Sequence, residues 1–304
     1  MSIALSYSGL RCVLEFLDPM RRIHIASRNH SLRTIEKTIP LSIVELGMNR
    51  YGLNLNVYLI DNFNDNKLRF RSGFRKDLER TLSLNLKPEK AMKKLLDSYL
   101  GIRSKIYVNC LLFVSAIPEF VPPNILLQIN EFRCSVCYSE HLLPIIDPSS
   151  FPLKKLRTTI DKPDHLNHPV LTSAKELIVL HGFDGLTQLI NQNNTNKHVA
   201  FEINTFRPED LLVLIKNWME NGKEIGTAFK FHDYGNNQRT MHFLLEDLKE
   251  FKNERFNSSL NCPRLIIPIN TTAEIHVSQD NENYIVVEVV PTTLKRESDA
   301  TGEP

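Results

Sequence analysis

The sequence has little net charge and no long apolar run. Its 37 Lys and Arg residues are almost balanced by 35 Asp and Glu residues, which leaves a formal net charge of +2. A helix that crosses a membrane needs about 20 consecutive, mostly apolar residues, and no such run occurs. So weak a charge does not favour nucleic acid or an anionic membrane surface. We therefore expect neither a nucleic-acid partner nor a membrane partner.

Cysteine is scarce, and its number is odd. Most of the five cysteines lie within apolar stretches: Cys12, Cys110, Cys134, Cys137 and Cys262. This usage favours free thiols in a reducing compartment over a disulfide framework. The first residues are interrupted by Arg11 and lack the apolar core of a signal peptide. We expect an intracellular protein, in the cytoplasm or the nucleus.

The sequence also lacks the short motifs of common catalytic sites. It contains no nucleophile elbow, phosphate-binding loop or metalloprotease motif. Polar residues do follow several expected strands, namely His181, Asp184, Glu202, His232 and Asp233. They are scattered, however, and show no motif spacing. We expect no catalytic residue and no cofactor.

One pair of cysteines has metal-ligand spacing. Cys134 and Cys137 form a lone CxxC, and a zinc site needs four converging ligands. His165 and His168 are the nearest additional candidates. The simpler interpretation places Cys134 in the core at the end of a strand, so we expect no metal site.

Six short apolar runs dominate the middle of the chain, and their starts are roughly 20 to 30 residues apart, as in leucine-rich-type repeats. Such units bury their apolar faces only by stacking on one another. We expect strands at Ile106–Val114, Leu126–Cys134, Leu153–Ile160, Glu176–Leu180, His198–Ile203 and Thr227–Tyr234.

The connections between these runs are of two kinds. Proline-rich segments follow residues 116 and 137 and predict extended or single-turn structure. Helices are expected after Pro88, after Pro208 and around Met241, where apolar residues recur at helical spacing. Gly101 is at the position of a left-handed cap that ends the first of these helices, and Asn221-Gly222 ends the second.

The two ends of the chain differ from this middle part. Residues 1–39 predict three short helices, with Asp18-Pro19 ending the first. Residues 40–75 predict a hairpin of strands 42–46 and 53–60 followed by a polar, mobile loop. Residues 261–294 alternate apolar and polar side chains and predict a β-hairpin, of two or three strands, that caps an array over 76–260. Residues 295–304 form a tail expected to be disordered.

Two segments resemble known proteins. In residues 5–27, Leu5 and an apolar stripe are followed by Asp18-Pro19 and Ile23, which looks like an F-box. The segment KNWMENGKEIGTAFKF at 216–231, together with the opening residues and the C-terminal hairpin, is similar to nematode families of F-box-like proteins with an associated domain of no assigned function. The resemblance implies docking on a Skp-type adaptor of cullin ubiquitin ligases through Leu5, Leu10, Val13, Leu14, Leu17, Asp18, Pro19 and Ile23.

The expected fold is therefore α/β: a short three-helix F-box-like unit, then an irregular leucine-rich-repeat-like array with a C-terminal β-hairpin. The expected function is a non-catalytic substrate receptor that links an unidentified protein target to the ligase. The alternative is an interaction scaffold of the same ancestry without ligase association. The apolar residues of the N-terminal helices can serve partner docking, packing on the chain's own strands, or both.

Overall fold

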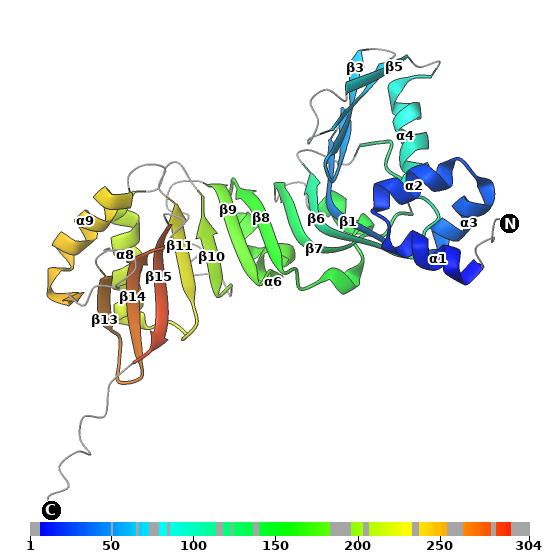
Figure 1. The fold of residues 1–304 in the computed structure, drawn as a ribbon. Helices are drawn as coiled ribbons and strands as arrows, with labels where there is room; N and C mark the ends of the chain where they lie inside the picture. Colours follow the sequence, from blue (N-terminus) through cyan, green and yellow to red (C-terminus); the bar gives the residue numbers. More distant parts are fainter. Residues whose placement is uncertain are drawn as a thin grey trace, which may run out of the picture. The chain divides into compact units, whose positions relative to one another are not determined.

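The structure is a computed structural model and consists of two compact units, residues 1–157 and 158–304. Each unit is described by itself below (Figure 1). The residues described are 7–49, 51–64, 67–72, 79–83, 86–113, 118–122, 124–135, 140–182, 196–202, 207–232, 237–253, 264–280 and 284–292.

Three short helices begin unit 1, as the sequence predicts. They are α1 (Tyr7–Phe16), α2 (Pro19–Ser27) and α3 (His30–Thr38). The Asp18 carboxylate accepts hydrogen bonds from the amides of Met20 and Arg21, and Pro19 occupies the first position of α2. Asp18-Pro19 therefore both ends α1 and starts α2.

A mixed sheet forms the body of unit 1. Its strands are β1 (Leu41–Asn49), β2 (Gly52–Leu55), β3 (Tyr58–Asn64), β4 (Lys67–Ser72), β5 (Glu79–Ser83), β6 (Ile106–Phe113) and β7 (Gln128–Ser135). They lie in the order β7-β6-β1-β2-β3-β4-β5. The first three in this order are parallel, and the others form an antiparallel meander.

The meander corrects the prediction of one strand at 53–60 and a loop at 61–75. Asn56 breaks the expected strand because it adopts a left-handed conformation (φ 56°), and its side chain accepts hydrogen bonds from the amides of Val44 and Glu45. Within the expected loop, Asp61 of β3 forms ion pairs with Arg69 and Arg71 of β4. These cross-strand pairs allow a polar segment to form strands. Residues 73–75 lie outside the described residues.

Strand β5 lies beyond residue 76, where the sequence predicts the start of the array. β5 pairs antiparallel with β4 along five positions, so the meander continues to Ser83. Helix α4 (Pro88–Tyr99) follows, and the single turns η1 (Leu143–Ile145) and η2 (Pro148–Ser150) occupy the proline-rich segment after β7. The helix and the single turns agree with the sequence prediction.

The end of α4 differs from the expectation in one residue. The left-handed position is Ile102 (φ 58°), not Gly101. Gly101 is required for another reason: a Cβ atom there would lie 2.4 Å from the carbonyl oxygen of Asp97. The β-branched Ile102 therefore occupies a conformation that L-residues rarely adopt, while its side chain is almost fully exposed.

Unit 2 also contains a mixed sheet. The division between the units falls within β8 (Lys155–Ile160). The elements that follow are η3 (Pro163–Asn167), α6 (Pro169–Ser173), β9 (Glu176–Gly182), β10 (His198–Phe201), α8 (Pro208–Asn221), β11 (Ala228–His232), α9 (Asn237–Asp247), η4 (Lys249–Phe251), β12 (Lys252–Asn253), β13 (Arg264–Pro268), β14 (Ala273–Gln279) and β15 (Tyr284–Pro291). Strands β9, β10 and β11 are parallel, whereas β15 joins β11 antiparallel and begins the series β15-β14-β13-β12.

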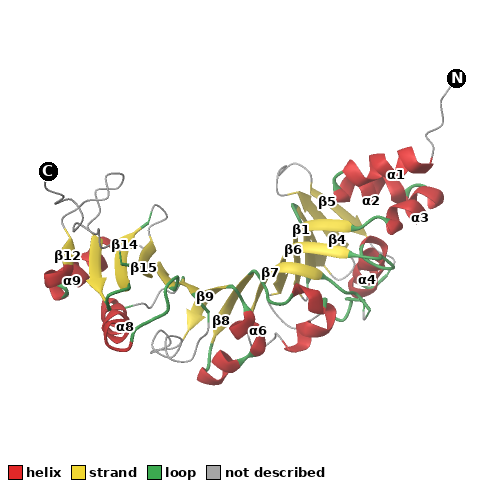
Figure 2. Ribbon diagram, turned by 90° about the horizontal axis from the view of Figure 1, so that it is seen from below, coloured by secondary structure: helices red, strands yellow, loops and turns green. Residues whose placement is uncertain are grey.

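The core of unit 2 lies between this sheet and α8 (Figure 2). Trp218 of α8 meets the ring of Phe229 edge to face at a centroid distance of 5.2 Å. Phe201 stacks on Phe231 at 4.8 Å. Gly222 ends α8 with a φ of 72°, as predicted. Trp218 is thus a core residue, whose burial joins helix and sheet.

The broad sequence prediction is confirmed. Each of the six apolar runs contains a strand, from β6 to β11, and the C-terminal segment forms the three strands β13, β14 and β15. The structure is mixed α/β with three N-terminal helices. Within the described residues, no helix is both long enough and apolar enough to cross a membrane.

The conformation of Ile102 generates a stability prediction. A left-handed conformation costs an L-residue about 1–2 kcal/mol, and Asn tolerates it better than a β-branched residue does. Because the Ile102 side chain is exposed, Ile102→Asn loses little packing and should raise the free energy of unfolding by about 1 kcal/mol. Urea denaturation measures this change. Ile102→Val is the control and should have no effect; equal stability of Ile102→Asn and the wild type would contradict the prediction.

Candidate functional site

A buried group of three charges connects the N-terminal helices to the body of unit 1. Glu36 of α3 accepts hydrogen bonds from Arg22 of α2 (3.0 Å) and from Arg103, in the loop before β6 (2.7 Å). All three side chains are at most 4% exposed. Burial lowers the pKa of Arg22, and Arg103 lowers it further, whereas Glu36 raises it.

The remaining donors of this triad bind backbone carbonyls. Arg22 donates to the carbonyl of Pro40 at the start of β1, and Arg103 donates to that of Tyr99 at the end of α4. Lys37 donates to the carbonyls of Asp97 and Gly101. Helices α2 and α3 are therefore joined to the start of β1, to the end of α4 and to the loop before β6 by hydrogen bonds that also compensate the buried charge.

Helix α1 carries a wider apolar surface than its packing uses. At about 100° per residue, its apolar side chains span an arc of about 200°. One half of this arc packs on α3, with Leu14 buried and Leu10 and Leu17 partly buried. The other half is exposed: Val13 is 47% and Phe16 87% accessible, and Cys12 lies beside them. We call Cys12, Val13 and Phe16 the α1 face.

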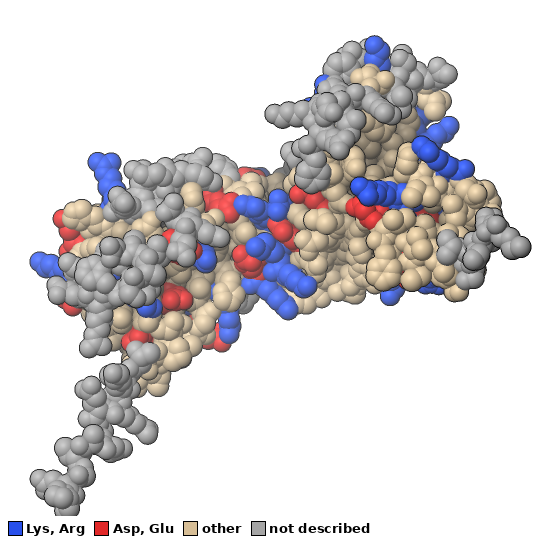
Figure 3. All heavy atoms as spheres, in the orientation of Figure 1, with Lys and Arg blue, Asp and Glu red and all other residues tan. Residues whose placement is uncertain are grey.

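Helix α1 contains only two charged residues among Tyr7–Phe16. In the view of Figure 3 the region over α1 is mostly uncharged, whereas basic and acidic side chains intermingle elsewhere. The charged residues of α1, Arg11 and Glu15, form an ion pair of 2.9 Å with each other. A partner that covers the α1 face therefore has to be largely apolar where it makes contact.

The structure divides the sequence-predicted docking residues into two groups. Leu14 and Ile23 are buried within the chain, so they support the three helices themselves. The exposed or partly exposed members are Leu10, Val13, Leu17, Asp18 and Pro19. Leu5 lies outside the described residues.

Sequence reasoning missed Phe16, the most exposed apolar side chain of α1. Its spacing from Cys12 and Val13, four and three residues, could have identified it, because residues so spaced share one side of a helix.

A groove lies on another side of α1, where Arg11 and Glu15 project. It has a volume of about 490 Å³ and runs between α1, α2 and the start of β1. Leu17 and Pro19, both predicted docking residues, lie on its wall together with Arg11, Glu15 and Pro40. The α1 face and this groove are therefore two separate candidate binding surfaces of the N-terminal helices.

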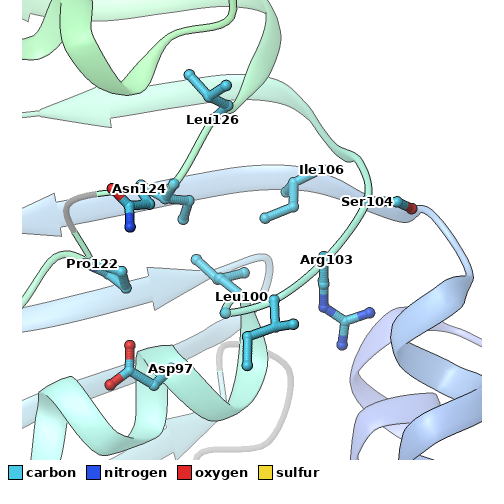
Figure 4. A pocket seen from close by; sticks show the side chains of 11 residues that line it. Asp97, Leu100, Arg103, Ser104, Ile106, Pro122, Asn124 and Leu126 are labelled. Atoms are coloured by element: carbon cyan, nitrogen blue, oxygen red, sulfur yellow. The ribbon is translucent and has the colours of Figure 1, made fainter.

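A second cavity, of about 430 Å³, lies between the end of α4 and the segment before β7 (Figure 4). Its apolar wall includes Leu100, Ile106 and Leu126. Arg103 also lies on the wall, but its side chain points toward the N-terminal helices, where Glu36 neutralises it. The guanidinium is therefore committed to the triad and is not available to bind a ligand.

Two of the three described cysteines are buried. Cys110 and Cys134 are buried in β6 and β7, and burial raises the pKa of Cys110 to about 11. Such a thiol is protonated and inert at neutral pH. Cys137 lies outside the described residues. Among those described, no group of three or more His, Cys, Asp or Glu side chains could hold a metal ion.

Two of the scattered polar residues, Glu202 and His232, each contact Tyr284 in unit 2, where β10 and β11 end. The hydroxyl of Tyr284 donates to Glu202 at 3.1 Å, and the ring of His232 contacts that of Tyr284 edge to face. His181 lies in β9, while Asp184 and Asp233 are outside the described residues. These contacts do not join a nucleophile to a base, so they do not suggest an acyl-transfer site.

Comparison with known proteins identifies one region of the chain. Residues 87–232 match the family described as Domain of unknown function (DUF3557). No curated protein and no solved structure matches the chain. The matched segment begins just before α4 and ends with β11, so it includes the six strands from β6 to β11. Helices α1–α3 and strands β13–β15 lie outside it.

The buried triad generates a second prediction. Glu36→Gln leaves two guanidinium groups buried without a counter-charge, and breaking a buried ion pair in this way costs about 3–5 kcal/mol. Chemical denaturation followed by circular dichroism should show that loss. Glu15→Gln, which removes an exposed partner of Arg11, is the matched control and should leave the transition unchanged. Equal effects of the two substitutions would show that the triad does not stabilise unit 1.

Proposed function

We propose that this chain is a non-catalytic protein-binding scaffold, and that it acts as an F-box-type substrate receptor linking a protein target to a Skp/cullin ubiquitin ligase. The observation that carries the proposal is the α1 face, where Val13 and Phe16 are exposed on a helix whose other side is packed. Burying exposed aromatic and aliphatic side chains is the main source of affinity in protein interfaces. The adaptor would cover these side chains.

The structural context supports this role for the N-terminal helices. A docking helix transmits a defined orientation only if it is held firmly by the rest of the protein. The Arg22–Glu36–Arg103 triad attaches α2 and α3 to the body of unit 1. The resemblance of residues 5–27 to an F-box adds the identity of the partner, a Skp-type adaptor, and with it an intracellular location.

The strand array would present the target in this proposal. Strands β6 to β11, for which the sequence predicts a leucine-rich-repeat-like array, fall within the segment that matches DUF3557, whereas β1, which pairs parallel with β6, lies outside it. That segment excludes α1, α2 and α3, so the adaptor-binding and target-binding parts would be separate.

A second candidate function is a scaffold without ligase association. The position of the DUF3557 match outside α1, α2 and α3 favours this scaffold, because a target-binding segment can work without an adaptor-binding helix. In this case the α1 face binds some other apolar partner. Co-expression with Skp-type adaptors distinguishes the two functions.

The test compares a variant of the α1 face with a control variant at a valine whose exposed fraction equals that of Val13 within a few per cent. Val13→Asp combined with Phe16→Asp places charge on the α1 face and should abolish co-purification with the adaptor, because a buried unpaired carboxylate opposes binding. Val213→Asp, on α8, is the control: Val213 is 45% exposed, against 47% for Val13, and should retain binding. Circular dichroism must show that all variants remain folded.

The outcomes separate the two candidate functions. Loss of adaptor binding in the α1 variant alone supports the receptor. Absence of binding by the wild type refutes the receptor and leaves the scaffold. Leu14 and Ile23 are unsuitable for the test, because they are buried and their substitution would unfold the helices.

A further inference from the structure

One face of the sheet in unit 1 is exposed along the first half of β1, β6 and β7. Parallel strands are usually covered on both faces, so an exposed half-face is unusual. Val44 is 68% accessible there, and Asn109 is also exposed. We call this surface the amide face; it consists of Ser42, Val44, Tyr107, Asn109, Gln128 and Asn130.

The register arranges these side chains in two rows. Ser42 pairs with Tyr107, which in turn pairs with Gln128. The second row lies two residues further along each strand, and within it Asn130 donates a hydrogen bond to Asn109 at 3.2 Å. Residues two apart project from the same face of a strand, so both rows point the same way.

The amide face is hollowed and continuous with the groove described above. Its side chains, with Ile43 and Val108, line a depression of about 260 Å³. Ser42 belongs both to this depression and to the groove beside α1 and α2. A ligand on the amide face can therefore extend toward the N-terminal helices.

The chemistry of the amide face selects against charged ligands. None of its six side chains is ionisable near neutral pH, although charged residues make up 24% of the chain. Carboxamides carry both donors and acceptors, as a peptide backbone does. Nucleic acids and phosphates require basic side chains, which this face does not provide.

The spacing of the rows fits a peptide in extended conformation. Two residues along a strand cover about 6.6–6.8 Å, and this is also the repeat of alternate residues in an extended peptide. A peptide that lies on the amide face parallel to the strands therefore presents alternate residues, with equivalent backbone groups, to the two rows. A helix repeats every 5.4 Å or so and does not match them.

We propose that the amide face binds an extended, uncharged peptide segment of a partner protein, recognised through the carboxamides of Asn109, Gln128 and Asn130. This inference rests on the proposed function, which assumes a protein target. It deepens that function because it names the surface that binds the target. Val44 and Tyr107 supply the apolar contacts, and the carboxamides pair with the peptide backbone.

The experiment selects ligands from a phage-displayed library of random dodecapeptides on the full chain. The enriched peptides should lack net charge, and their dissociation constants are then measured by fluorescence polarisation. Asn109→Asp keeps an oxygen that accepts the hydrogen bond from Asn130 but adds a charge. It should weaken peptide binding at least about tenfold, because the carboxylate is desolvated and loses a donor. Val213→Asp is the control and should bind as the wild type does.

Several results would overturn the inference. These are the absence of enriched peptides, enrichment of charged peptides, and equal affinity of Asn109→Asp and the wild type. Light scattering that shows a dimer broken by Asn109→Asp would identify the face as a contact between copies of the chain instead. Adaptor binding, measured in parallel, should be unaffected by Asn109→Asp, so failure of the receptor proposal and failure of this inference are separate observations.

Discussion

The attachment of the N-terminal helices depends on one buried carboxylate. Glu36 bonds Arg22 from the preceding helix and Arg103 from the loop before β6. Burying three charges is unfavourable unless each is paired and its remaining donors are satisfied. Here the carbonyls of Pro40 and Tyr99 complete the arrangement. The helices, α4 and the first parallel strands consequently form one unit.

This attachment explains how the exposed part of α1 can be a binding surface. The helix uses half of its apolar arc to pack on α3, and the triad fixes α2 and α3 to the sheet. Val13 and Phe16 are then held outward at a fixed orientation. A small three-helix segment could not bury enough apolar surface to be rigid by itself. The buried ion pairs hold α2 and α3 on the sheet, and in the proposed function the exposed apolar side chains of α1 would supply the affinity.

Local signals in the sequence predicted most elements. Asp18-Pro19 gave the boundary between α1 and α2, and Pro208 with Gly222 gave the limits of α8, because caps and prolines act on neighbouring residues. The meander was harder to predict, since residues 61–64 and 67–72 are mostly polar and form strands with ion pairs between β3 and β4. The antiparallel addition of β15 to β11 likewise requires knowledge of tertiary pairing.

The candidate site was only partly predictable for the same reason. The stripe of α1 was visible in the sequence, but which half of it is buried depends on α3. Glu36 and Arg103 are 67 residues apart, and no local pattern indicates that they meet. The amide face depends on the register of three strands, which a shift of one residue would invert.

Cys12 offers the most direct measurement of the central claim, that the α1 face is a partner-binding surface. It is exposed beside Val13 and Phe16, whereas Cys110 is buried and serves as an internal reference. Alkylation of each thiol, followed by mass spectrometry with and without a Skp-type adaptor, reports whether α1 is covered. The account predicts that the adaptor slows alkylation of Cys12 and leaves Cys110 unreactive. An unchanged rate at Cys12 in the presence of a bound adaptor would contradict it.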